Sequence, residues 1–181
     1  MDLYLTSPVG PFASAVGAAF GTFTARQDVS PQPVPVILPN ALHLGSKIKI
    51  EAEGEISTTA TPTCVFGVYL GTNVAPPAPV SILAETGALS FATAAAWAWR
   101  LEYRGIVVGL GTAGSIVGMG QIEFGTSLTA TTSAPLPITQ ALRTVAIDTT
   151  IVRSVGVCAT FSASSASNTV KTINLSVLLL N

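Results

Sequence analysis

The chain has 181 residues, of which 9% are charged and 49% are hydrophobic, and its formal net charge at pH 7 is −1. A chain of this length suits one domain and buries about 70% of its unfolded surface, so its core needs neither a disulfide nor a metal. Eight basic against nine acidic residues leave no basic field, which argues against a nucleic-acid partner. Because average soluble proteins are about 25% charged, this composition favours a permanent oligomer or a larger particle.

The hydrophobic composition is not a membrane signal. Thr, Ser, Gly and Pro interrupt every charge-free stretch, so none reaches the roughly 18 consecutive apolar residues of a spanning helix. The N-terminus begins Met1-Asp2 and lacks the basic start of a secretory signal. We therefore expect no membrane partner and a protein made in the cytoplasm.

Residues 1–35 are predicted to form an extended, proline-rich arm. Proline fixes φ and biases the preceding residue toward extended backbone, and five prolines lie in this stretch. No charge occurs between Leu3 and Ala25, whereas a solvated tail would be charged and poor in aromatics. The arm should therefore lie on a partner or on its own domain, and we expect it to dock on an assembled particle or an adjacent subunit. The candidate partner-binding residues are Leu3, Tyr4, Leu5, Phe12, Phe20 and Phe23.

Residues 36–181 are predicted to form an all-β domain. From Lys47 to Ile56, charged side chains alternate with apolar side chains or glycine, which is typical of a strand with one exposed face. A turn-rich link of Ser, Thr, Ala and Pro precedes a second strand at residues 64–70. Further alternating runs predict strands at residues 97–104, 106–108, 116–124, 144–147, 155–161 and 173–179. Eight or so strands separated by Gly, Pro and Ser indicate an antiparallel, jelly-roll-like β-sandwich.

Two segments compete with this all-β interpretation. Residues 92–98 are the best helix candidate, but they are short and run into an alternating strand. Residues 109–114 match the G-x-G-x-x-G pattern of dinucleotide sites, but a poor helix former follows and no acidic residue lies about 20 positions further on. We interpret the second segment as a flexible loop between two strands.

The residue types that carry catalysis are scarce. His43 is the only histidine, and Cys64 and Cys158, each within a predicted strand, are interpreted as small buried hydrophobes. A disulfide between the two cysteines would require their strands to be neighbours, which the sequence does not show. A metal site needs three or four ligands, which these residues do not supply. Trp97, Trp99 and Tyr103 are spaced either for stacking on a sugar or for a core, and the core is favoured. The sequence therefore predicts no enzyme, no metal and no cofactor.

One segment resembles a known family. The run from Leu44 to Thr63, with its Gly-Ser start, alternating strand and Thr-Thr-Ala-Thr-Pro-Thr link, precedes a strand ending at Gly71. This arrangement is similar to a segment of tailed-bacteriophage virion structural proteins. The resemblance is specific over residues 44–71 and extends in general layout over residues 40–180. It implies a virion component of the head or tail, often trimeric, and no catalytic residues.

The leading hypothesis is a capsid decoration protein of the virion, synthesised in the host cytoplasm, that binds and stabilises the assembled head. Its partners would be further copies of itself in a homotrimer and the major capsid protein or other virion proteins. The alternative is a minor tail or fibre protein that binds a host receptor or glycan. A chain of 181 residues without a coiled coil or repeat suits a compact decoration protein better than a long fibre.

Overall fold

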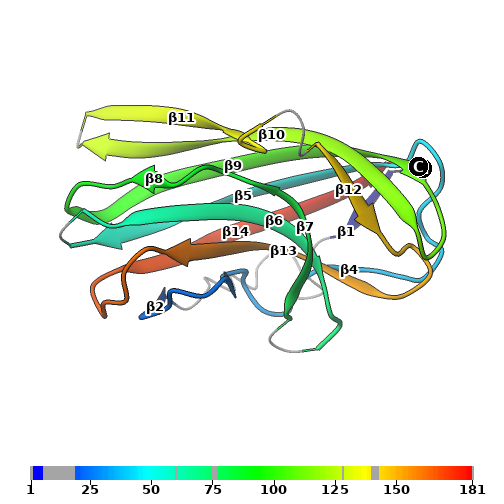
Figure 1. Cartoon of the computed structure of the whole chain (residues 1–181), viewed down its shortest axis with the longest axis horizontal. Coiled ribbons are helices and arrows are strands. Elements are labelled where there is room, and N and C mark those ends of the chain that lie inside the picture. The colour runs from blue at the N-terminus through cyan, green and yellow to red at the C-terminus, as the bar shows by residue number, and fades with distance from the viewer. Residues whose placement is uncertain are drawn as a thin grey trace.

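The computed structural model describes residues 2–5, 19–59, 61–74, 77–127, 129–139 and 143–180. These residues form two antiparallel sheets packed face to face, without a helix among them, so the predicted all-β sandwich is confirmed (Figure 1). The strands are β1 (Asp2–Leu5), β2 (Phe20–Gly21), β3 (Gln27–Asp28), β4 (Val36–Ile37), β5 (Lys47–Thr58), β6 (Thr63–Gly71), β7 (Pro79–Glu85), β8 (Leu89–Ser90), β9 (Ala94–Gly109), β10 (Gly114–Ser127), β11 (Ala130–Leu136), β12 (Thr144–Ile147), β13 (Arg153–Phe161) and β14 (Thr169–Leu180).

The chain winds between the sheets rather than building them one after the other. The first sheet has the order β1-β14-β5-β9-β10-β11, with β2 on β14 and β12 on β10. The second has the order β3-β13-β6-β7, with β4 on β13 and β8 on β6. The consecutive strands β5 and β6 lie in different sheets, and each pairs with one of the consecutive strands β14 and β13. This pairing gives the sandwich its rolled, jelly-roll-like course.

The alternation along β5 decides which side of the first sheet faces the core. Ile48, Ile50 and Ile56 are fully buried, whereas the charged residues between them are exposed or half-buried. Aromatic side chains join the two sheets from their inner faces. The rings of Phe66 and Trp99 lie 5.1 Å apart, centroid to centroid, and this tilted geometry is favourable for aromatic pairs.

Strand β9 is longer than the sequence suggested. Gly105 does not end it, and the separately predicted strand at residues 106–108 is its continuation through to Gly109. Gly105 is tolerated inside the strand because Ile116 and the Tyr103 ring occupy the space that a Cβ would take. The helix candidate at residues 92–98 is not a helix, since residues 94–98 form the first part of β9. Residues 109–114 form the turn between β9 and β10, as expected, with Gly111 at φ +92°.

The second sheet is covered on both faces. Alternation places Val155, Val157 and Phe161 of β13 in the core, yet the intervening residues are buried as well. The chain from β3 to β4 covers them by running along β13 (Figure 1). The sequence predicts that the arm ends and the sandwich begins after residue 35. In the structure Phe23 and Val29, which precede that boundary, belong to the core.

The two cysteines are free and lie on opposite faces of the second sheet. Cys64 points into the core between the sheets, whereas Cys158 is buried on the outer face beside Gly67. Burial raises the pKa of the Cys64 thiol to about 12 and also raises that of Cys158. Both behave as the small buried hydrophobes that the sequence indicated.

Replacing Phe23 with Ala tests whether the N-terminal segment is part of the folding unit. Phe23 is 8% exposed and its ring lies 5.2 Å from that of Phe161. We expect Phe23→Ala to lower the free energy of unfolding by about 3–5 kcal/mol in urea denaturation. Val80→Ala is the control, because Val80 is 54% exposed and its loss should change stability by less than about 0.5 kcal/mol. A loss below about 1 kcal/mol for Phe23→Ala would show that the segment is not integral.

Candidate functional site

The five arm residues that the structure describes, of the six predicted to bind a partner, lie on different strands and loops. Leu3, Tyr4 and Leu5 lie in β1, which pairs with β14 at the edge of the first sheet. Phe12 lies outside the described residues. Phe20 is partly buried and Phe23 buried, and both pack against the core of their own sandwich. The sequence left open whether the arm contacts a partner or its own domain. In the structure Phe20 and Phe23 contact their own domain.

The outward side of β5, β9, β10 and β14, which we call the charged face, holds most of the chain's charge. Five of the six ion pairs among the described residues lie there. The two shortest join Lys49 to Glu51 at 2.9 Å and Arg104 to Glu102 at 2.6 Å. The charged residues of this face are Lys47, Lys49, Glu51, Glu53, Glu55, Arg100, Glu102, Arg104, Glu123 and Lys171.

Charges of opposite sign remain at the two ends of this face. Within the described ranges, Lys47 and Arg143 at one end form no ion pair, and neither do Glu53 and Glu123 at the other. Register explains the separation, because Lys47 pairs with Ile106 whereas Glu53 pairs with Arg100, six residues further along β5. The neutralised middle therefore separates a cationic end from an end at which Glu53 and Glu123 lie on either side of Arg100.

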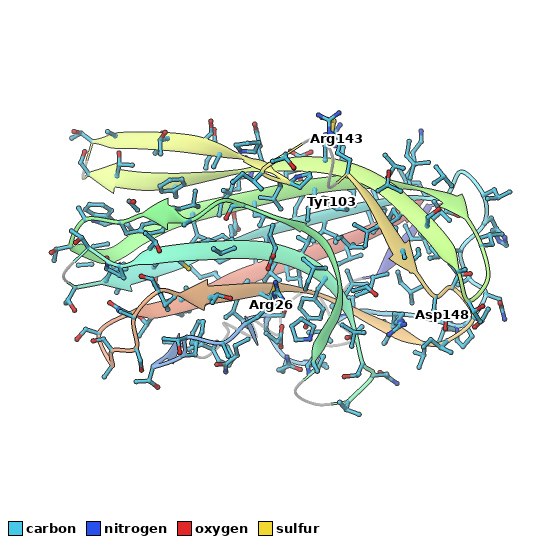
Figure 2. All side chains as sticks on the ribbon, in the orientation of Figure 1. Arg26, Tyr103, Arg143 and Asp148 are labelled. Atoms are coloured by element: carbon cyan, nitrogen blue, oxygen red, sulfur yellow. The ribbon has the colours of Figure 1, made fainter. Side chains whose placement is uncertain are left out.

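A hollow of about 570 Å³ opens at the cationic end, and we call it the basic hollow. Four of the chain's eight basic residues line it, and none of the acidic residues whose side chains the structure describes does. Arg143 reaches it from the chain before β12, at the upper edge of the molecule in Figure 2. Its lining residues are Lys47, Ile48, Lys49, Arg104, Gly105, Ile106, Val117, Gly118, Met119, Arg143 and Leu180. The sequence analysis missed this hollow because its cations are far apart in the chain.

Exposed apolar side chains occur on the loops and on the end of β9 close to the turn between β9 and β10. Backbone hydrogen bonds tie these loops together, from Gly45 N to Val107 O at 2.8 Å and from Asn40 N to Thr149 O at 2.8 Å. We call this surface the apolar end. Its members, each at least 44% exposed, are Leu38, Leu44, Ile106, Val108, Leu110 and Ile151.

The catalytic candidates are not brought together among the described residues. His43 is exposed on the loop before β5, and no group of three or more His, Cys, Asp or Glu in the described ranges is placed to hold a metal. Trp99 and Tyr103 are buried in the core, as predicted, so they are not a platform for sugar rings. Within the described part of the chain, no helix has the length and hydropathy needed to cross a membrane.

One carboxylate is buried where the N-terminal segment covers the second sheet. Asp28 is 4% exposed and accepts hydrogen bonds from Ser30 N at 3.0 Å, Gln32 Nε2 at 2.8 Å and Tyr69 Oη at 2.7 Å. Burial raises the pKa of Asp28, and the hydrogen bonds only partly oppose that shift. The same burial, together with the Asp28 charge, raises the pKa of Tyr69. This group ties the segment to β6.

No family model matches the chain, and no curated protein sequence matches it.

The raised pKa of Asp28 predicts a pH dependence of stability. A carboxyl whose pKa is raised by folding contributes stability below its unfolded pKa of about 3.9 and loses that contribution as pH rises through the folded pKa. Asp28→Asn keeps the shape but cannot ionise. The stability of the natural chain relative to Asp28→Asn should therefore fall between about pH 4 and neutrality, as measured by urea denaturation across that range.

Asp148→Asn is the control, because folding shifts the pKa of Asp148 in the opposite direction to that of Asp28. Hydrogen bonds from Thr150 lower the pKa of Asp148, so the natural carboxylate should lose relative stability as pH falls, not as it rises. If the difference between the natural chain and Asp28→Asn does not change with pH, then Asp28 does not titrate as its burial implies.

Proposed function

We propose that the chain is a structural protein of a tailed-bacteriophage particle, a capsid decoration protein that binds the assembled head as a homotrimer. The apolar end carries this proposal. Six large apolar side chains are exposed there, four on loops and two, Ile106 and Val108, at the end of β9, and backbone hydrogen bonds join these segments to one another. Monomers that act alone rarely expose a contiguous apolar patch of this kind, whereas obligate assembly surfaces do.

The remaining support comes from the fold and from the resemblance of residues 44–71 to virion proteins. The sandwich of long strands presents loops at its ends, where they are available for contact. Binding that occurs only on the assembled shell stabilises that shell by mass action. The glycan-binding alternative finds less support, because two of its three aromatic candidates are buried.

The direct test is to locate the chain on intact particles by electron cryo-microscopy. We expect density for the sandwich at regular lattice positions on the head surface, with three copies around each position. Density on the tail or fibres would favour the alternative function. Absence of the chain from purified particles would refute the proposal of a virion protein altogether.

The role of the apolar end is tested by Leu44→Asp combined with Leu110→Asp. Both leucines are exposed, at 65% and 44%, so the fold should survive, whereas an interface that buries them should not. Losing two buried leucines costs about 3–6 kcal/mol of association free energy per copy, which should convert trimers to monomers in sedimentation velocity experiments. Val80→Asp is the matched control, because Val80 is 54% exposed on β7, away from the apolar end. Trimers that persist in the double variant would exclude the apolar end as the subunit interface.

A further inference from the structure

We propose that the basic hollow binds an acidic peptide segment of another protein, with carboxylates at Lys47 and Arg143 and an aliphatic side chain against Ile106 and Met119. This interaction goes beyond the proposed function and does not depend on it, because the hollow belongs to the single chain. The hollow lies on the charged face and shares one residue, Ile106, with the apolar end, whereas its four cations lie outside that end.

The cations of the basic hollow come from separate segments of the chain. Lys47 and Lys49 come from β5, Arg104 comes from β9, and Arg143 comes from the chain before β12. A backbone hydrogen bond of 2.9 Å from Gly118 N to Arg143 O holds Arg143 beside β10. Among the side chains that the structure describes, no acidic one lines the hollow, so its like charges repel one another and a bound anion relieves that repulsion.

Two of these cations are available to a ligand. Lys49 and Arg104 already contact Glu51 and Glu102, on the side of the hollow toward the neutralised middle of the face. Lys47 and Arg143 form no ion pair among the described residues. The planar guanidinium of an arginine binds a carboxylate through two parallel hydrogen bonds, so Arg143 suits that group.

The apolar part of the lining distinguishes the ligand from a simple inorganic anion. Met119 is 51% exposed and Ile106 is 44% exposed, and Val117 and Leu180 also line the hollow. An aliphatic side chain placed on them would be removed from water and would also exclude water from the neighbouring ion pairs, which strengthens them. The lining therefore favours a ligand that carries both carboxylates and an aliphatic group.

The position of the hollow favours a peptide over a small molecule or a nucleic acid. Small-molecule sites enclose 70–90% of the ligand, whereas this hollow opens on a sheet face with the backbone of Gly105 and Gly118 in its lining. A continuous phosphate backbone would leave the hollow and run past Glu51 and Glu102, which repel it. A short acidic segment ends before it reaches them.

The test uses the purified full chain and two fluorescent pentapeptides, one with three Glu and two Leu, the other with Gln at each Glu position. We expect the Glu peptide to bind at least about tenfold more tightly in fluorescence anisotropy at about 50 mM salt, and to weaken as salt is raised. Lys47→Ala combined with Arg143→Ala should weaken its binding by about tenfold or more. Arg100→Ala is the matched control, because Arg100 lies on the same face outside the hollow and is 63% exposed.

Two further measurements separate a peptide site from a general anion site. Met119→Ser should weaken the Glu peptide severalfold while leaving competition by inorganic phosphate unchanged. Equal binding of both peptides, or full binding by the Lys47 and Arg143 double variant when its circular dichroism is native, would overturn the proposal. A single-stranded oligonucleotide that binds the hollow more tightly than the Glu peptide would overturn the choice of an acidic peptide. None of these results depends on whether the chain decorates particles.

Discussion

Packing of Phe66 against Trp99 is the contact on which the sandwich depends, since it joins the middle of one sheet to the middle of the other. Trp99 reaches this position because Gly54, its neighbour on β5, has no side chain, and a Cβ there would lie 2.8 Å from the Trp99 ring. A second ring pair, Phe91 with Phe124, joins the sheets further along. Burying large aromatic surfaces is the main favourable contribution to such a core.

Once one side of the first sheet is committed to these contacts, its other side must carry the charges. This explains how a chain with only 9% charged residues still has a densely charged surface. Because most of the few charged residues lie on this sheet face, the surface at the end of the sandwich is apolar. The molecule therefore separates its surface chemistry by location, with electrostatic recognition on a sheet face and apolar contact on the loops.

The sequence predicted features that depend on local periodicity and could not predict those that depend on long-range contact. Alternation along β5 identified its buried isoleucines, and the spacing of Trp99 and Tyr103 identified core positions. Gly105 misled the prediction because glycine is a common strand terminator, whereas here the Ile116 side chain and the Tyr103 hydroxyl occupy the space beside it. The burial of Asp28 gave no local signal, because its partner Tyr69 is 41 residues away.

The basic hollow was missed for the same reason. Lys47 and Lys49 were recognised as part of an alternating strand, but Arg143 stands alone in the sequence and comes close to them only through the pairing of β12 with β10 and of β10 with β9. The apolar end likewise joins residues 38–46 to residues 148–151 through hydrogen bonds that no local pattern indicates. Contact surfaces of this kind follow from topology, which a single sequence specifies only indirectly.

The placement of the two free thiols provides a built-in pair of reporters. Cys64 lies between the sheets, so a thiol reagent reaches it only when the sandwich itself opens. Cys158 lies on the outer face of β13 and pairs through its backbone with Asp28, so it becomes accessible when the N-terminal segment alone detaches. Comparing the labelling rates of the two cysteines would therefore distinguish local release of the segment from global unfolding, without the introduction of any foreign probe.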